Sequence, residues 1–170
     1  MNDLLNAILS RRSIRKFTSE PISDELVTEL LKAGMSAPSA HNQQPWQFVV
    51  IKKREALNQI MRFHPYSTML KEANLAILVC GDRNLFKSEN FWTQDCAAAT
   101  ENILLAAHAL GLGAVWMGIY PQAVLVKSMM ILIEAPENII PFSLIAVGYP
   151  KEKKDAANRF EEKRIHYDRW

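Results

Sequence analysis

The chain has 170 residues, and its 20 Lys and Arg against 18 Asp and Glu leave a net charge of +2. A chain of this length is expected to form a single domain over residues 1–170, to bury roughly 70% of its unfolded surface and to lack room for a separate nicotinamide domain. The near balance of charge excludes the overall basic field of a nucleic-acid-binding protein, so any bound anion is held locally.

A basic cluster follows a short predicted helix near the start of the chain. It contains Arg11, Arg12, Ser13 and Arg15, and guanidinium forks with a hydroxyl suit a phosphate group. In an extended segment Arg11, Ser13 and Arg15 share one side, because side chains alternate with a period of two. Such clusters are more often solvated surface, so the cluster alone is weak evidence for a phosphate site.

An amide-rich loop over residues 37–46 follows the second predicted helix, which begins after Ser23 and ends at Gly34. Amide side chains both donate and accept hydrogen bonds, as the ring edge of a flavin or pyrimidine requires. An ordinary turn is the alternative, because Ser, Asn and Pro are common turn residues. The candidate residues of this loop are Pro38, Ser39, Asn42 and Gln44.

Continuous apolar runs predict buried strands over residues 48–51, 75–80 and 142–147. Helical periodicity predicts helices over residues 54–63 and 91–110, and Pro121 suits the first turn of another helix. The helix over 91–110 is rich in Ala, which fits either a helix that meets its mate in a dimer or an ordinary core helix. The pattern of elements indicates an α+β protein.

A glycine-containing segment links the long helix to a further predicted strand. Gly111 ends the helix and Gly113 permits a tight turn into residues 114–117. Gly111, Gly113 and Gly118 do not form a dinucleotide fingerprint, which needs a strand before it and a helix after it. Trp116 and Met117 are adequately explained as core residues.

The tail over residues 151–170 is charged and resembles a solvated terminus. Its scattered aromatic residues, including Phe160 and Trp170, argue against that interpretation, because they are costly to leave uncovered.

Cys80 and Cys96 are sixteen residues apart and belong to no metal or dithiol motif, so they are expected to be reduced and buried. No apolar run reaches about twenty residues and no leader pattern is found, so a cytoplasmic protein that binds neither membrane nor nucleic acid is expected.

Four motifs in this order resemble the nitroreductase family of FMN-dependent oxidoreductases. They are RRSIRKF at 11–17, APSAHNQQPW at 37–46, AAHALGLGAVWMG at 106–118 and GYP at 148–150. The resemblance implies a three-layer α+β fold with a central mixed or antiparallel sheet flanked by helices. It also implies an intertwined homodimer with non-covalent FMN at the interface, the long helix in that interface and the tail packed on the partner.

The resemblance also implies roles for individual residues. The phosphate is assigned to Arg11, Arg12, Ser13, Arg15 and a tail cation, with Arg164 matched first and Arg159 and Lys163 as alternatives. Pro38, Ser39, Asn42 and Gln44 are assigned to the ring or ribityl chain, with Ser39 reaching the flavin of the neighbouring subunit. Val115, Trp116, Met117 and Gly118 are assigned to the isoalloxazine. No side chain is assigned as a catalytic acid or base, and no metal is expected.

The implied reaction passes electrons from NADH or NADPH through FMN to small electron-poor acceptors, such as nitroaromatics or quinones, by a ping-pong mechanism. A dehalogenating or flavin-destroying relative and a non-catalytic flavin-binding protein are the alternatives. Residues 63–71 or 84–93 are the candidate lid, in which aromatic residues either stack on a substrate or anchor the loop. His41 and His64 are candidates for lining the pocket.

Overall fold

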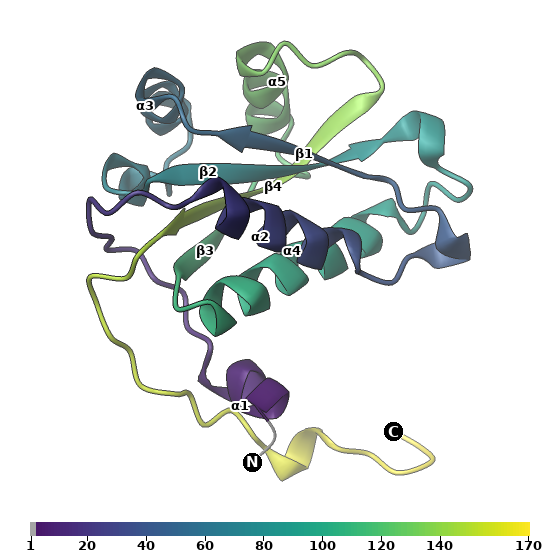
Figure 1. Ribbon diagram of the computed structural model, residues 1–170. Helices are drawn as coiled ribbons and strands as arrows, with labels where there is room; N and C mark the ends of the chain where they lie inside the picture. The colour runs from purple at the N-terminus through teal and green to yellow at the C-terminus, as the bar shows by residue number, and fades with distance from the viewer. Residues whose placement is uncertain (1–2) are drawn as a thin grey trace.

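The computed structural model describes residues 3–170, which form five α-helices around a four-stranded antiparallel sheet (Figure 1). The strands lie in the order β1-β2-β4-β3, so β3 is at an edge of the sheet. The α+β class and the central antiparallel sheet are confirmed. The strands are β1 (Trp46–Ile51), β2 (Leu75–Asp82), β3 (Gly113–Gly118) and β4 (Ile139–Gly148). The helices are α1 (Asp3–Ser10), α2 (Asp24–Met35), α3 (Arg54–Phe63), α4 (Trp92–Ala109) and α5 (Ala123–Leu132).

Helices cover both faces of the sheet and make the fold three-layered. Helices α3 and α5 lie above the sheet in Figure 1, and α2 and α4 lie below it. Successive residues of β2 enter opposite cores: Ile77 packs with α2 and α4, whereas Leu78 packs with α3 and α5. Burial on both faces explains why β2 and β4 are continuous apolar runs rather than alternating ones.

Local sequence signals account for most boundaries, with two corrections. The hydroxyl of Ser23 accepts a hydrogen bond from the Leu26 N–H and caps α2 as predicted. Gly34 does not end that helix, which continues to Met35; a Cβ at Gly34 would lie 3.0 Å from Ile103 Cδ1, so the glycine allows α2 to approach α4. Pro121 precedes α5 instead of standing in its first turn, because Gln122 is the N-cap residue.

The two ends of the chain lie together at the periphery. The Ile14 N–H donates to the Ala114 carbonyl at 3.0 Å, and the Lys151 N–H donates to the Lys16 carbonyl at 2.9 Å. Beyond that point the tail runs alongside α1, away from the sheet (Figure 1). No residue of α1 is buried, and Phe160 and Tyr167 are 75% and 84% exposed. Both ends therefore expose apolar side chains.

Both cysteines are free and buried, as the sequence predicts. Burial raises the pKa of Cys80 to about 12, so its thiol is protonated and unreactive at neutral pH. Within residues 3–170 no helix is long and apolar enough to cross a membrane, and no group of three His, Cys, Asp or Glu side chains could hold a metal ion.

Candidate functional site

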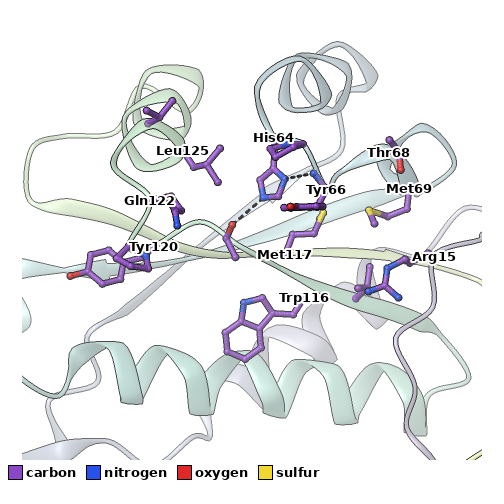
Figure 2. A pocket seen from close by; sticks show the side chains of 15 residues that line it. Arg15, His64, Tyr66, Thr68, Met69, Trp116, Met117, Tyr120, Gln122 and Leu125 are labelled. Atoms are coloured by element: carbon purple, nitrogen blue, oxygen red, sulfur yellow. Dashed lines mark hydrogen bonds between the residues drawn. The ribbon is translucent and has the colours of Figure 1, made fainter.

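A cavity of about 850 Å³ opens beside β3 (Figure 2). Its volume falls within the roughly 300–1,000 Å³ that small-molecule sites occupy. Residues 115–118 of β3 form its floor, α5 and the segment over residues 64–69 form two walls, and Arg15 supplies a charge. The four predicted residues Val115, Trp116, Met117 and Gly118 thus lie together with Arg15.

In the described part of the chain, the side of β3 that faces away from β4 pairs with no further strand of the sheet. The Ile119 N–H donates to the Phe142 carbonyl at 3.1 Å. Residues of an antiparallel pair alternate between groups that face the partner strand and groups that face away, so the peptide groups of Trp116 and Gly118 face the open edge. The contact of the Ala114 carbonyl with Ile14, on the same edge, agrees with this alternation.

The two glycines that bound β3 have different surroundings. A Cβ at Gly113 would lie 2.7 Å from Ile14 Cγ2, because the N-terminal segment is docked there. A Cβ at Gly118 would meet nothing within 4 Å. The end of β3 is therefore open for a ligand to approach the backbone closely.

A histidine joins the wall of the cavity to its floor. His64 is only 3% exposed, and its ring lies 3.0 Å from the Gly118 carbonyl through Nε2. Its Nδ1 accepts a hydrogen bond from the Tyr66 N–H at 3.2 Å (Figure 2). These partners assign a neutral ring that carries its proton on Nε2.

The first candidate lid, residues 63–71, is a firmly held wall of the cavity. The Ser67 hydroxyl donates to the His64 carbonyl at 2.7 Å, and Arg54 donates to the carbonyls of Leu70 and Ala73.

The second candidate lid, residues 84–93, does not line this cavity. Phe86 stacks on the buried Trp92 with 5.5 Å between ring centroids, so these two aromatics anchor the loop to the core.

The predicted phosphate residues divide between cavities. Arg15 lines the large cavity. Arg11 Nε lies 3.2 Å from Glu101 Oε1 but makes no well-aligned hydrogen bond, although it is buried. Arg12 lines two smaller cavities of about 440 and 350 Å³, and Arg11 lines the second of these with it rather than the cavity of Arg15, so the expected convergence of Arg11 and Arg15 is not seen within this chain. The carbonyl of Ser13 accepts a hydrogen bond from Lys154 Nζ at 2.8 Å.

The tail brings Arg159, rather than Arg164, to the arginine cluster. Arg159 lines the 350 Å³ cavity together with Arg11 and Arg12. Arg164 is 72% exposed and pairs with Glu161 at 2.7 Å, and Lys163 pairs with the same carboxylate at 3.1 Å. The tail has little regular structure, so no periodicity in the sequence could distinguish these three cations.

The amide-rich loop lies outside the large cavity and is fastened to α4. The buried Asp95 accepts hydrogen bonds from the Ala40 N–H and from Gln43 Nε2. Gln44 donates to Asn42 Oδ1 at 2.9 Å, and its N–H donates to Ser39 Oγ at 3.0 Å. This chain alone does not bring Pro38, Ser39, Asn42 and Gln44 together with Arg15. His41 lies on the same loop and does not line the cavity either.

Comparison with known proteins agrees with this architecture. The model of the "Nitroreductase family" matches residues 8–79 and 63–149. A relative from Methanothermobacter thermautotrophicus, named "Putative NADH dehydrogenase/NAD(P)H nitroreductase", is 48% identical over 168 residues, which cover 99% of this chain and 88% of the relative. The chain belongs to the nitroreductase family.

Solved structures extend the likeness to the whole chain. A crystal structure of the same-named protein from Parabacteroides distasonis is 39% identical, has a TM-score of 0.96 and matches over 100% of both chains. A structure from Desulfovibrio desulfuricans, solved in complex with FMN, is 34% identical with a TM-score of 0.86 and covers 100% of this chain and 99% of that one. The nitroreductase-like fold is thereby confirmed.

Proposed function

We propose that the protein is a cytoplasmic FMN-dependent oxidoreductase. It passes electrons from NADH or NADPH to small electron-poor organic acceptors, such as nitroaromatics or quinones, by a ping-pong mechanism. The observation that carries the proposal is the cavity at the free edge of β3, with Arg15 and the open Gly118 in its lining. The FMN in the Desulfovibrio relative and the NAD(P)H in the names of the nearer relatives support it.

The residues of the cavity fit both chemical parts of FMN. The outward peptide groups of Trp116 and Gly118 supply donors and acceptors for the polar edge of the ring, and Met117 supplies apolar surface. We assign the phosphate to Arg11, Ser13 and Arg15, with Arg159 as the tail cation and Arg12 and Arg164 in outer positions. The buried Nε atoms of Arg11 and Arg12, which lack a well-aligned hydrogen bond, have donor capacity for such an anion.

A second copy of the chain would complete the site. The proposed homodimer covers the exposed apolar residues of α1 and the tail, residues 151–170, within a single domain per subunit. The partner's amide-rich loop would then bring Pro38, Ser39, Asn42 and Gln44 to the flavin. This arrangement explains why a well-ordered loop of polar residues lies outside the cavity of its own chain.

The protein's own groups would bind and orient the FMN rather than transfer protons. FMN, when bound, supplies the chemistry of accepting a hydride and passing electrons onward. The arginines hold the phosphate end, the edge of β3 presents N–H groups where negative charge develops on the ring, and the wall over residues 64–69 excludes water. The nicotinamide and the acceptor would use this one cavity in turn, which is the physical basis for the ping-pong order.

Purified protein tests the proposal directly. We expect a yellow preparation, or FMN uptake by flavin-free protein, and bleaching of the visible absorbance under anaerobic conditions with NADH or NADPH. Addition of a quinone or a nitroaromatic compound then restores the colour. A yellow protein that neither nicotinamide bleaches would identify a non-catalytic flavin-binding protein. A colourless protein that refuses added FMN would exclude a flavin function.

A further inference from the structure

His64 connects two elements that are distant in sequence at the open end of β3. The ring spans from the Tyr66 N–H, on the wall, to the Gly118 carbonyl, on the edge of the sheet (Figure 2). Both nitrogens are engaged, and the side chain is almost completely buried. A buried imidazole with two satisfied bonds is held in one orientation, so it can in turn fix the groups that it contacts.

Within residues 3–170, Gly118 has no docked segment beside it to hold its open side, unlike Gly113 at the other end of β3, which has Ile14 against it. Gly118 is the last residue of the strand, and without a side chain it has more backbone freedom than other residues. On the side of β4 its neighbour Ile119 is held by the bond to Phe142. On the open side, the Gly118 carbonyl is held by His64. The N–H of Gly118 points to this same side, because the N–H and C=O of a strand residue face the same way.

We propose that His64 is a positioning residue that aims the backbone N–H of Gly118 at the flavin ring. This inference rests on the proposed function, since it requires an isoalloxazine at the free edge of β3. A donor held in place before binding stabilises the negative charge of the reduced ring at no cost of reorganisation. His64 would thereby tune the affinity for the ring and its reduction potential without touching the flavin.

Two substitutions separate the two hydrogen bonds of His64. In His64→Asn the amide oxygen can take the place of Nδ1 and accept from Tyr66, but the side chain is too short to reach Gly118. In His64→Gln the amide nitrogen can take the place of Nε2 and donate to the Gly118 carbonyl. Ser67→Ala is the control for the wall, because it removes the bond that Ser67 makes to the His64 carbonyl and leaves the ring in place.

The measurements are the dissociation constants of FMN and riboflavin, by fluorescence titration of flavin-free protein, and the midpoint potential of the bound flavin. We expect His64→Asn to weaken the binding of both flavins by the same factor, about five- to tenfold, as for one lost hydrogen bond. The midpoint potential of the bound flavin should also fall. His64→Gln should recover most of the affinity and potential, and Ser67→Ala should resemble the wild type. Thermal unfolding of each variant checks that the fold is intact.

Several results would overturn the inference. One is His64→Asn behaving like the wild type, and another is His64→Gln or Ser67→Ala losing as much as His64→Asn, because the Gly118 bond would then not be the cause. Wild-type protein that binds neither flavin would overturn the proposed function and this inference together. A wild type that binds FMN normally while all variants match it would overturn the role of His64 alone.

Discussion

The sheet around β4 and the two ends of the chain differ in how far their residues are buried. Every residue of β4 from Pro141 to Gly148 is buried, whereas no residue of α1 and none over residues 151–170 is. The proposed flavin site draws on both regions, because its floor belongs to the sheet and its cations belong to the ends. The buried sheet is a finished floor within one subunit, whereas the exposed ends, which carry the cations, are left to be covered in the proposed dimer, where the partner's amide-rich loop would also reach the ring and ribityl chain.

The largest effect is expected from charging the exposed face of α1. Leu5 and Ile8 are 48% and 50% exposed, so covering them against a partner would contribute about half of the roughly 1.5–3 kcal/mol of a fully buried side chain each, and burying a charge there would add a desolvation cost. Leu5→Glu with Ile8→Glu should therefore weaken the proposed dimer at least a hundredfold. Analytical ultracentrifugation should show monomers, with FMN lost as the partner's loop is lost. Ile131→Glu, on the exposed face of α5, is the matched control and should remain dimeric. A double variant that stays dimeric would place the interface elsewhere.

The next largest effect is a loss of FMN affinity that distinguishes the phosphate end of the site from the ring end. Arg15→Ala should weaken FMN binding by on the order of 1.5–3 kcal/mol, as for a lost charge-assisted hydrogen bond. Riboflavin, which lacks the phosphate, should be affected far less in the same fluorescence titration. Lys16→Ala removes a neighbouring exposed cation and should change neither affinity. Equal losses for both ligands would mean that Arg15 does not contact the phosphate.

Features that depend on local sequence patterns could be predicted, and features that depend on contacts between distant residues could not. Burial on both faces leaves continuous apolar runs, so β2 and β4 were predictable. The cap at Ser23 was predictable from a local signal, a hydroxyl residue followed by two acidic residues. Contacts between distant residues left no local signal. Gly34 looked like a helix end because its contact with Ile103 is invisible in sequence, and the bond between Gln43 and Asp95 joins residues 52 apart. The tail cations could not be ranked, because an irregular segment has no period.

A smaller loss of flavin affinity is expected from filling the space beside Gly118. Gly118→Ala adds a methyl group that meets nothing in the folded chain, so the melting temperature should stay within a few degrees of the wild type. The same methyl would separate the ring from the edge of β3, and both FMN and riboflavin should bind about tenfold more weakly. Gly113→Ala is the contrasting variant: its methyl would overlap Ile14, so the loss should be in stability. Unchanged flavin binding by Gly118→Ala would remove the ring from this edge.

The smallest effect is on stability, and it concerns the junction at which Glu152 of the tail bonds to Arg15 of the N-terminal segment. The carboxylate of Glu152 accepts a hydrogen bond from the Arg15 N–H at 2.6 Å, which lowers the pKa of Glu152, and Lys154 Nζ lies 3.2 Å away. A carboxyl whose pKa is lower in the folded state stabilises the fold above its unfolded pKa of 4.5, and that contribution disappears as the pH falls through the folded value.

Glu152→Gln should therefore reduce the free energy of unfolding at pH 7 by about 1 kcal/mol or less, as for a partly exposed ion pair. Below pH 4.5 the variant and the wild type should converge, because protonation removes the same charge from the wild type. Urea unfolding between pH 3 and 7 measures the difference. A gap of constant size across this range would show that the charge of Glu152 does not stabilise the junction between the N-terminal segment and the tail.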